Sequence, residues 1–390
     1  MSIDMRVLVA MSGGVDSSTA ALILKQRGHE VVGCSMQLWD YRRNPVRDGA
    51  HLVGSCCSTD DVYDARRVAE HLGFSFYVVN LQEEFQKRVI QPFMGEYLAG
   101  KTPSPCILCN SFLKFDKLMN FAEQVGIGYV ATGHYARNEY SEGEGYRLLK
   151  GKDPAKDQSY YLFELTQKQL ARILFPVGDL EKPQVRELAR RHGLETAFKH
   201  ESQEICFVPD RDYAGFIQRH AGEVDSDLGR QAEAASRPGP IVMKDGTILG
   251  EHSGIHHFTV GQRKGLGIGH PRPLYVVRLD LGRNTVIVGY KEDVYSRGLI
   301  AERLNWMANG APSEAMRASV KIRARHPEAA ATIEMQGDTA SIVFDSPQMA
   351  VTPGQAAVFY RGEQVLGGGW IRQAIELESG EEEAISEQVT

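Results

Sequence analysis

The sequence has few cysteines and no long apolar run. Its 390 residues include six cysteines, too few for the disulfide framework of many secreted domains. We therefore expect reduced thiols in the cytoplasm, where each cysteine is a core residue, a metal ligand or a reactive group. No segment approaches the roughly 20 apolar residues of a membrane span, and the first apolar run lacks a preceding basic region. We expect no association with membranes.

An excess of positive charge is also missing. The chain has 44 Lys and Arg against 50 Asp and Glu, a formal net charge of −6 at pH 7. This balance argues against general affinity for nucleic acids, but it does not exclude a local basic face, because phosphate binding depends on where the charges lie. The length suits two or three domains, each with its own core.

Strand-like and helix-like patterns alternate in the first half of the chain. Residues 6–12 and 30–37 form β-rich runs, and apolar residues recur at helical spacing after the first run. This alternation predicts an α/β fold with a doubly wound, mostly parallel sheet. From about Ile255 onward, short β-rich runs with glycine turns predict all-β structure, as one or two small barrels.

The predicted organisation has four parts along the chain. They are an α/β catalytic domain at 1–205, a central linking region at 206–285, a β-barrel at 286–375 and an acidic disordered tail at 376–390. Within the central region, residues 222–240, "GEVDSDLGRQAEAASRPGP", are predicted to be an exposed, mobile insertion.

The stretch "AMSGGVDSS", Ala10 to Ser18, lies between the first predicted strand and the first predicted helix. Its two glycines let backbone N–H groups approach a ligand, its serines add hydroxyl donors, and the helix N-terminus favours an anion. A pyrophosphate would fit there, and Asp16 could hold a magnesium ion. The string matches neither a Walker A loop nor Gly-x-Gly-x-x-Gly. It resembles the pyrophosphatase loop of the N-type ATP pyrophosphatases, which cleave ATP between its α and β phosphates and adenylate a substrate oxygen.

The cysteines fall into two groups. Cys34 lies within a predicted strand and is expected to be a core residue, while Cys56 and Cys57 lie in a loop and are expected to be structural or incidental. Cys109 begins an apolar-periodic segment, so we place it at or near a helix N-terminus, where the helix field stabilises a thiolate. Cys206 lies in a polar loop before a proline. We expect chemical roles for the last two.

The pair Cys106 and Cys109, in "SPCILC", admits several interpretations. The spacing suits a zinc half-site, a redox pair, an iron–sulfur ligand pair, or one nucleophile beside a bystander. A zinc site needs two further ligands: Cys206 could be the third, but no histidine pair or second Cys-x-x-Cys marks the fourth. A thioredoxin-like pair would follow the first strand rather than a long helix.

Over nearly its full length the chain resembles the tRNA-specific 2-thiouridylases, enzymes that place sulfur on carbon 2 of the wobble uridine of certain tRNAs. The resemblance is carried by ordered strings, which include "AMSGGVDSS", "DARRVAEHLG", "YLAGKTPSPCILCNSFLKFD", "ATGHYAR", "KDQSYYLFEL", "LFPVGDLEKPQVRELA", "SQEICFV", "FTVGQRKGLGIG" and "VTPGQAAVFY". It implies an ATP-dependent sulfurtransferase that adenylates and then thiolates the uridine. The implied partners are the anticodon stem-loop of tRNA and a persulfide donor, such as a cysteine desulfurase or a sulfur-relay protein.

The resemblance also implies roles for individual residues. Cys109 matches the family's nucleophile, and Cys206 matches the cysteine that carries a persulfide. ATP binding falls on Ala10, Met11, Ser12, Gly13, Gly14, Val15, Asp16, Ser17, Met36 and Gly133. Contacts with tRNA fall on Ser104, Pro105, Cys106, His134, Lys156, Asp157, Gln158, Arg263, Lys264, Arg323, Ala324 and Gln355. Among these, Arg263 and Lys264 lie between glycines and suit backbone phosphates.

The chain departs from the family pattern at Cys106. Many members have Asn-Pro-Asp-x-x-Cys here, so Cys106 replaces an aspartate thought to act as an acid/base group, and Ser104 replaces the asparagine. Cys106, Cys109 and Cys206 together resemble the set by which related tRNA thiolases hold a 4Fe–4S cluster. Two mechanisms follow as hypotheses: a cluster held by these three thiolates, or a metal-free Cys206 persulfide with a Cys109–Cys206 disulfide as its product.

Two other classes of function fit parts of the sequence. One is an ATP pyrophosphatase that adenylates a small metabolite, which would not need the β-rich region or Cys206. The other is a zinc-stabilised RNA-binding protein without catalytic activity, which would not need an intact pyrophosphate loop.

Overall fold

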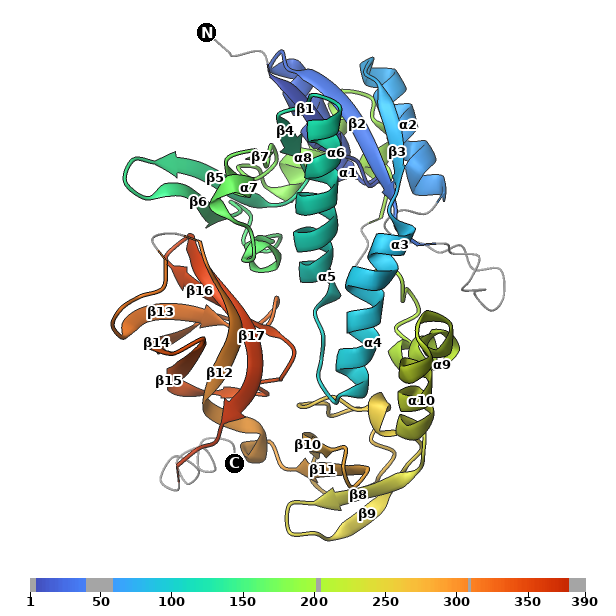
Figure 1. Ribbon diagram of the computed structural model, residues 1–390, viewed down its shortest axis with the longest axis vertical. Coiled ribbons are helices and arrows are strands. Elements are labelled where there is room, and N and C mark those ends of the chain that lie inside the picture. The colour runs from blue at the N-terminus through green and yellow to red at the C-terminus, as the bar shows by residue number, and fades with distance from the viewer. Residues whose placement is uncertain (1–4, 40–58, 201–204, 308–309, 379–390) are drawn as a thin grey trace.

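The structure is a computed structural model that describes residues 5–39, 59–200, 205–307 and 310–378 (Figure 1). Cys56, Cys57 and most of the predicted tail at 376–390 lie outside the described residues. Figure 1 shows an α/β part at one end, a β-barrel beside its long helices, and a small sheet with two helices at the other end. In the described ranges, no helix has both the length and the apolar character needed to cross a membrane.

Five strands form the central sheet in the order β3-β2-β1-β4-β7. Every neighbouring pair is parallel, which confirms the predicted doubly wound α/β class. The chain moves outward from β1 in one direction through β2 and β3, and in the other through β4 and β7, so the topological switch lies beside β1. The strands are β1 (Arg6–Ala10), β2 (Glu30–Gln37), β3 (Phe76–Asn80), β4 (Tyr129–Ala131) and β7 (Ile173–Leu174).

Alternation along β1 supplies a core on each face of this sheet. Val7 and Val9 pack into one cluster and Leu8 and Ala10 into another, because successive side chains of a strand point to opposite faces. The first cluster includes residues of α1 (Val15–Gln26), α2 (Thr59–Leu72) and α8 (Lys182–Arg191). These three helices therefore cover one face.

Two long antiparallel helices cover the other face and extend beyond the sheet (Figure 1). The first runs through α3 (Gln82–Phe85), η2 (Gln86–Ile90) and α4 (Gln91–Leu98), and the second through α5 (Pro105–Leu108), η3 (Cys109–Lys117) and α6 (Leu118–Gln124). The middle stretch of each has wider π-helical turns. In the first helix these turns directly precede Pro92, which has no N–H to donate.

The region after residue 205 contains two helices and a four-stranded sheet. The helices are α9 (Tyr213–Val224) and α10 (Ser226–Ala235), and the sheet has the order β10-β11-β8-β9. Its strands are β8 (Gly239–Met243), β9 (Ile248–His252), β10 (Tyr275–Asp280) and β11 (Thr285–Gly289).

The prediction of an exposed insertion at 222–240 was wrong, since most of it is α10 and the ends of its neighbours. Asp225 caps α10 by accepting hydrogen bonds from the N–H groups of Asp227 and Leu228. Leu228 and Ala232 are buried, so the helix has an apolar side. The glycines and serines of the segment favoured a loop prediction and obscured this helical pattern.

A closed antiparallel barrel of six strands ends the described chain. The strands pair in the order β12-β15-β14-β13-β16-β17, and β17 pairs back to β12, which confirms the predicted barrel. They are β12 (Tyr295–Trp306), β13 (Met316–Lys321), β14 (Ala329–Gln336), β15 (Thr339–Met349), β16 (Ala356–Arg361) and β17 (Gln364–Ile375). The division at residues 205, 285 and 375 stays a prediction.

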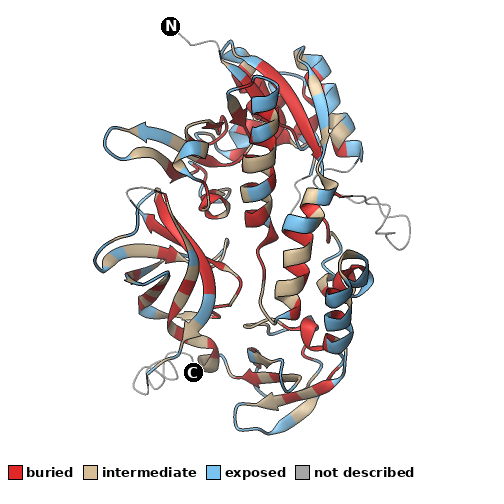
Figure 2. Cartoon of the chain, in the orientation of Figure 1, coloured by how far each residue is buried: buried red, intermediate tan, exposed pale blue. Residues whose placement is uncertain are grey.

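A hairpin between the α/β part and the barrel joins the two. It consists of β5 (Ala136–Ser141) and β6 (Gly145–Lys150), and Leu149 pairs with Gln364 of β17. Figure 2 shows that buried residues concentrate in the central strands and on the inner sides of the long helices. The remaining elements are short: η4 (Ser159–Leu162), α7 (Gln167–Leu170), η5 (Glu195–Phe198), η6 (Ile255–His257) and η7 (Glu292–Val294).

Candidate active site

The predicted phosphate loop, Ala10 to Ser18, connects β1 to α1 as the sequence predicts. Gly13 has a φ of +70°, and a Cβ there would overlap the backbone carbonyl of Asp61 in α2, so only glycine suits the position. Gly14 precedes the first helical residue, and its carbonyl accepts hydrogen bonds from the Ser17 and Ser18 hydroxyls at 3.2 and 2.9 Å. The turn is thereby fixed with the N-terminus of α1 open toward an anion.

Asp16, in the first turn of α1, is already engaged. Both carboxylate oxygens accept hydrogen bonds from Lys182 Nζ, at 2.7 and 2.8 Å, and Tyr135 Oη donates to Oδ1 at 2.7 Å. The Lys182 side chain is only 9% exposed. A nearly buried ammonium group therefore lies beside the phosphate loop, although it is 166 residues away in sequence.

Two further predicted nucleotide contacts lie at neighbouring strand ends. Met36 is buried as the second-last residue of β2, and Gly133 lies two residues after the end of β4. A Cβ on Gly133 would come within 2.5 Å of Ser17 N, so glycine allows β4 to end against the start of α1. The carboxyl ends of β1, β2 and β4 thus form one edge, where ligands of open α/β sheets bind.

Lys199 also contacts the predicted phosphate loop. Its Nζ donates to the carbonyl of Gly13 at 3.2 Å and to the carboxylates of Asp61 and Asp64 at 2.6 and 2.5 Å. Burial lowers the pKa of Lys199, but the hydrogen bonds to Asp61 and Asp64 outweigh burial and raise the pKa overall. Lys199 therefore remains charged and joins the loop, α2 and the segment that leads toward Cys206.

The helix that carries Cys109 begins one turn before it. Ser104 is the N-cap and Pro105 the first helical residue, a position that tolerates proline because its N–H would have no partner. Cys106 therefore occupies the first turn and is exposed, while Cys109 begins the wider turns and is partly buried. The helix field acts most strongly in the first turn, so it favours a thiolate at Cys106 more than at Cys109.

The other thiols differ in burial. Cys206 is partly buried and packs, like Cys109, against the large hydrophobic cluster of the long helices. Cys34 lies within β2, and burial raises the pKa of its thiol to about 12. The expectation of a core role for Cys34 fits this burial.

The metal hypotheses meet no preformed ligand set. In the part of the chain that the structure describes, no three His, Cys, Asp or Glu side chains are placed so that they could hold a metal ion. Cys106, Cys109 and Cys206 have the donor chemistry of a cluster site, but they are not gathered as one. Asp16 is a single carboxylate paired with Lys182, so a magnesium ion there would need phosphate oxygens from the nucleotide.

Tyr161, in the turn η4, lies close to Cys106. Burial and then the Cys106 thiol raise the pKa of Tyr161 to about 12, and the charge of the barrel residue Arg325 opposes this. Tyr161 therefore stays a neutral phenol. The turn η4 packs against the first turn of the Cys106 helix.

Side chains from outside hold the turn that bears Cys109. Asn110 Nδ2 donates to the carbonyl of Tyr161 at 3.2 Å, and the Ser111 hydroxyl donates to Glu164 Oε2 at 2.5 Å. Glu164 Oε1 in turn accepts from Trp370 Nε1 of the barrel at 2.8 Å. This carboxylate therefore connects the turn that bears Cys109 to the barrel.

The predicted tRNA contacts are placed in different ways. Asp157 accepts three hydrogen bonds within its own loop, and Gln158 bonds the backbone of Tyr135. His134 is buried, and burial, with a contribution from Lys114, holds its pKa well below the usual range. In this structure Asp157 and Gln158 form hydrogen bonds within the chain, and His134 is buried in it.

Four more of these residues lie on the central region and the barrel. Arg263 and Lys264 are exposed in the loop before β10. Gln355 Nε2 donates to the carbonyls of Thr102 and Pro103 at 2.9 and 3.3 Å, just before the helix of Cys106. Arg323 donates to the carbonyl of Met349 at 3.1 Å, and burial lowers its pKa. The remaining predicted contacts are Ser104, Pro105, Lys156 and Ala324, of which the first two are buried.

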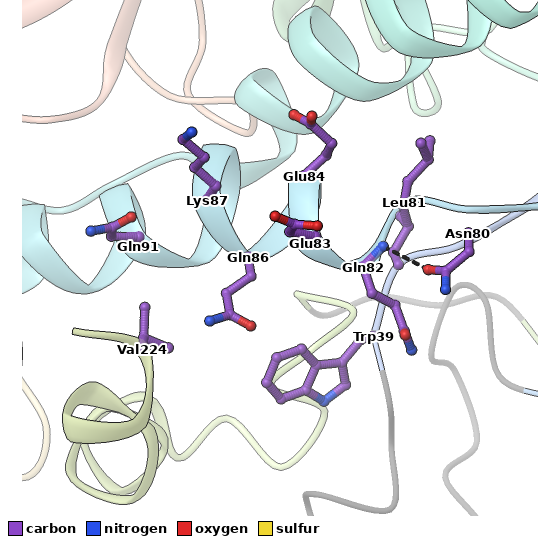
Figure 3. A pocket seen from close by; sticks show the side chains of 11 residues that line it. Trp39, Asn80, Leu81, Gln82, Glu83, Glu84, Gln86, Lys87, Gln91 and Val224 are labelled. Carbon is purple, nitrogen blue, oxygen red and sulfur yellow. Dashed lines mark hydrogen bonds between the residues drawn. The ribbon is translucent and has the colours of Figure 1, made fainter.

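A large hollow of about 660 Å³ lies beside the first long helix (Figure 3). Its lining includes Trp39 after β2, Asn80 at the end of β3, and Glu83, Gln86 and Lys87 of the helix. None of the predicted nucleotide residues or thiols lines it. It is thus separate from the edge at β1 and β4.

Lys182, Lys199, Tyr161 and Glu164 were missed from the sequence. Each lies far along the chain from the group it contacts, so no local spacing connects them. A signal for Lys182 was its place next to Pro183 at a predicted helix start, which fixes a charged side chain at a helix end but does not say what it faces.

Comparisons with known proteins cover most of the chain. A family model described as a tRNA methyl transferase HUP domain matches residues 5–210, a tRNA methyl transferase PRC-barrel domain matches 231–290, and an aminomethyltransferase beta-barrel domain matches 296–371.

Curated relatives match at about half identity. The tRNA-specific 2-thiouridylase MnmA of Geotalea uraniireducens is 52% identical over 371 residues, 95% of this chain and 96% of that protein. The protein of the same name from Solibacter usitatus is 51% identical over 372 residues, 94% and 98% of the two chains. Among solved structures, a 4-thiouridine synthetase–RNA complex with bound ATP is 17% identical, with a TM-score of 0.35 over 59% of this chain and 52% of that one. That likeness is too weak to argue from.

Proposed function

The chain belongs to the tRNA-specific 2-thiouridylase family, and from this premise we propose that it is a tRNA-uridine 2-sulfurtransferase that uses ATP to activate the wobble uridine. The observation that carries the proposal is the identity of about half over 95% of the chain to 2-thiouridylases. The phosphate loop at the carboxyl ends of β1, β2 and β4 supports the use of ATP, and the exposed Arg263 and Lys264 support binding of an RNA backbone.

Adenylation is the first proposed step. A carbonyl oxygen is a poor leaving group, so O2 of the uridine attacks the α-phosphate of ATP, diphosphate leaves, and an O-adenylated base forms. The loop from Ala10 to Ser17 binds the phosphates, with Met36 and Gly133 beside the nucleotide. Lys182, held at Asp16 in the nucleotide-free chain, stabilises negative charge on the diphosphate. Such fixed charges act strongly where water is excluded.

Sulfur transfer is the second proposed step. The terminal sulfur of a Cys206 persulfide attacks carbon 2 and AMP leaves. The Cys109 thiolate then attacks Cys206 Sγ, so that a Cys109–Cys206 disulfide forms and the sulfur stays on the base. Alternatively, Cys109 attacks first and releases hydrosulfide, which displaces AMP. In both orders an external thiol reductant restores the two thiols, and the target base must be out of the stack.

The iron–sulfur alternative remains a hypothesis beside this route. The three thiols suit a cluster chemically, yet the described structure does not gather them, so we derive no step through a cluster. Methyl transfer, in the description of two matching family models, is disfavoured by the curated relatives and by the two partly buried thiols, which suit sulfur chemistry.

A cysteine series tests the proposal. Cys109→Ser and Cys206→Ser should each abolish 2-thiouridine formation in vitro and leave ATP binding intact, because each removes one sulfur nucleophile. Cys34→Ala, which removes a buried core thiol, is the matched control and should retain activity. Cys106→Asp should also retain activity in metal-free protein.

Two outcomes would contradict parts of this account. Thiolation by Cys109→Ser or Cys206→Ser would remove the role assigned to that residue. Loss of activity in Cys106→Asp, together with loss of iron and acid-labile sulfide from anaerobically purified protein, would replace the persulfide route by a cluster at Cys106, Cys109 and Cys206.

A further inference from the structure

Phe112 is an exposed aromatic residue on the helix of Cys109. It lies three residues beyond Cys109 within η3 and is 36% exposed, whereas Leu113 and Phe115 beside it are buried. The packing of this helix therefore does not require a large apolar ring at Phe112, and part of the ring faces water.

A cation covers Phe112 from the other long helix. The guanidinium carbon of Arg88, in η2, lies 5.4 Å from the centroid of the Phe112 ring, within the range of a cation–π contact. Within the described residues Arg88 forms no ion pair or hydrogen bond, but its charge acts on Glu84, whose pKa is lowered first by the hydrogen bond from Lys117 and also by the charge of Arg88. A guanidinium group without an ion pair, stacked on a partly exposed ring, is therefore available to an anionic, aromatic ligand.

The two helices are held in register next to this contact. Lys117 Nζ donates to Glu84 Oε1 at 2.8 Å across the same helix pair, about one turn from the Arg88–Phe112 contact on each helix. Phe112 lies between Cys109 and Lys117 along η3, and the partner helix runs antiparallel to it (Figure 1). The Arg88–Phe112 contact is therefore nearer to Cys109 along the helix than the Lys117–Glu84 ion pair is.

We propose that Phe112, with Arg88 on its ring, is a stacking platform for an unpaired nucleobase of the RNA substrate, adjacent to the uridine that is presented to Cys109. The proposal rests on the proposed function, since it needs an anticodon loop at this site. Proteins bind unstacked bases on aromatic rings and guanidinium planes, and Arg88 adds attraction to the phosphate beside that base. The occupant is a purine or pyrimidine base next to the target, and the target itself remains at the thiols.

The test uses an anticodon stem-loop RNA with 2-aminopurine next to the wobble uridine. This base loses fluorescence when it stacks, so titration with the full-length protein reports both affinity and stacking. We expect Phe112→Ala to weaken binding by about tenfold, the lower part of the range for loss of one stacked base, and to abolish the quenching. Phe112→Tyr should restore both. Tyr140→Ala, which removes a 67% exposed ring on the β5–β6 hairpin, is the matched control and should bind like the unaltered chain.

The outcomes separate this inference from the proposed function. If the unaltered chain thiolates the RNA and Phe112→Ala binds and quenches equally well, the platform is refuted and the function stands. If the unaltered chain neither binds nor thiolates the stem-loop, both proposals fall. Thermal unfolding of each variant identifies any loss of folding, and recovery in Phe112→Tyr distinguishes stacking from a structural effect.

Discussion

At the scale of single residues, the site is organised by charges that come from distant parts of the chain. Two lysines contact the predicted phosphate loop: Lys182 at Asp16 and Lys199 at the Gly13 carbonyl. Asp16, Asp61 and Asp64 balance their charges. The triphosphate of the ATP that we propose as substrate would offer both lysines a second anionic partner.

Lys182→Gln should impair adenylation specifically. Glutamine keeps a hydrogen-bond donor near Asp16 but removes the positive charge that stabilises the leaving diphosphate. We expect the rate of RNA-dependent AMP formation to fall by about a hundredfold, the scale observed when one preorganised transition-state contact is removed. Diphosphate release in a single turnover measures it.

Lys182→Arg is the control for this prediction, since it retains the charge and should recover part of the rate. The role would be contradicted if Lys182→Gln formed AMP at the rate of the unaltered chain. A fall in RNA affinity at an unchanged adenylation rate would also contradict it.

The sequence identified the residues whose roles depend on local pattern. The glycines of "SGGVDSS" and the thiols Cys109 and Cys206 stand out because chemistry and spacing are both visible in one short string. Lys182, Lys199 and Glu164 stand out only after folding, because their partners are brought to them by the sheet and the barrel.

At the scale of elements, the turn that carries Cys106 and Cys109 is fixed by groups outside its own helix. The Ser111 hydroxyl bonds both its own helix, at the Ile107 carbonyl, and Glu164. Further along, Gln169 Nε2 donates to the carbonyl of Phe115 at 2.6 Å. The Phe115 carbonyl of the wide turns thus has a hydrogen-bond donor from outside the helix, which favours the π-helical geometry there.

Glu164→Ala should loosen this turn. The change leaves Ser111 Oγ and Trp370 Nε1 without their shared acceptor, so we expect a cost of about 1–3 kcal/mol in the free energy of unfolding. Because Cys109 is mispositioned while the phosphate loop is untouched, kcat for thiolation should fall about tenfold, with KM for ATP unchanged.

Glu164→Gln provides the matched comparison. It keeps an acceptor for one of the two donors and should recover much of kcat. An equal loss of kcat in both variants, or a raised KM for ATP in Glu164→Ala, would argue against a role in positioning Cys109.

Element boundaries were less predictable than element types. The alternation of strands and helices was predicted correctly. The helix predicted to begin near Cys109 begins instead at Pro105, where Ser104 is the N-cap and proline is tolerated as the first helical residue. The hairpin β5–β6 has no clear strand pattern in the sequence, because β5 is mostly polar and its residues Glu139 and Tyr140 are exposed. The segment at 222–240 was predicted to be a loop because it is rich in turn-forming residues, and the helix-capping role of Asp225 was not recognised.

At the scale of the whole molecule, the barrel holds the helix that carries Cys106 and Cys109 in place. Thr102 N donates to the carbonyl of Pro353 at 2.8 Å, and Gln355 holds the carbonyls of Thr102 and Pro103. Trp370 holds Glu164 from the same barrel. Both ends of the segment from Thr102 to Ser111 are therefore fixed by contacts that depend on the barrel.

These contacts give the barrel a role in the proposed reaction, because they hold the helix of Cys106 and Cys109 in place. An enzyme that adenylates a small molecule would need the sheet and its phosphate loop, but it would not need a barrel attached next to these thiols. The sequence predicted the sheet and the barrel separately, and only the folded chain relates them through Gln355 and Glu164.

The most direct test of the central claim is the stoichiometry of a single turnover. Purified full-length protein loaded with sulfane sulfur would be mixed with ATP and an anticodon stem-loop that contains the wobble uridine, and AMP and 2-thiouridine would be quantified. We predict one 2-thiouridine for each AMP, with no thiolation when ATP is omitted. Formation of AMP without 2-thiouridine, or thiolation without ATP, would contradict the account.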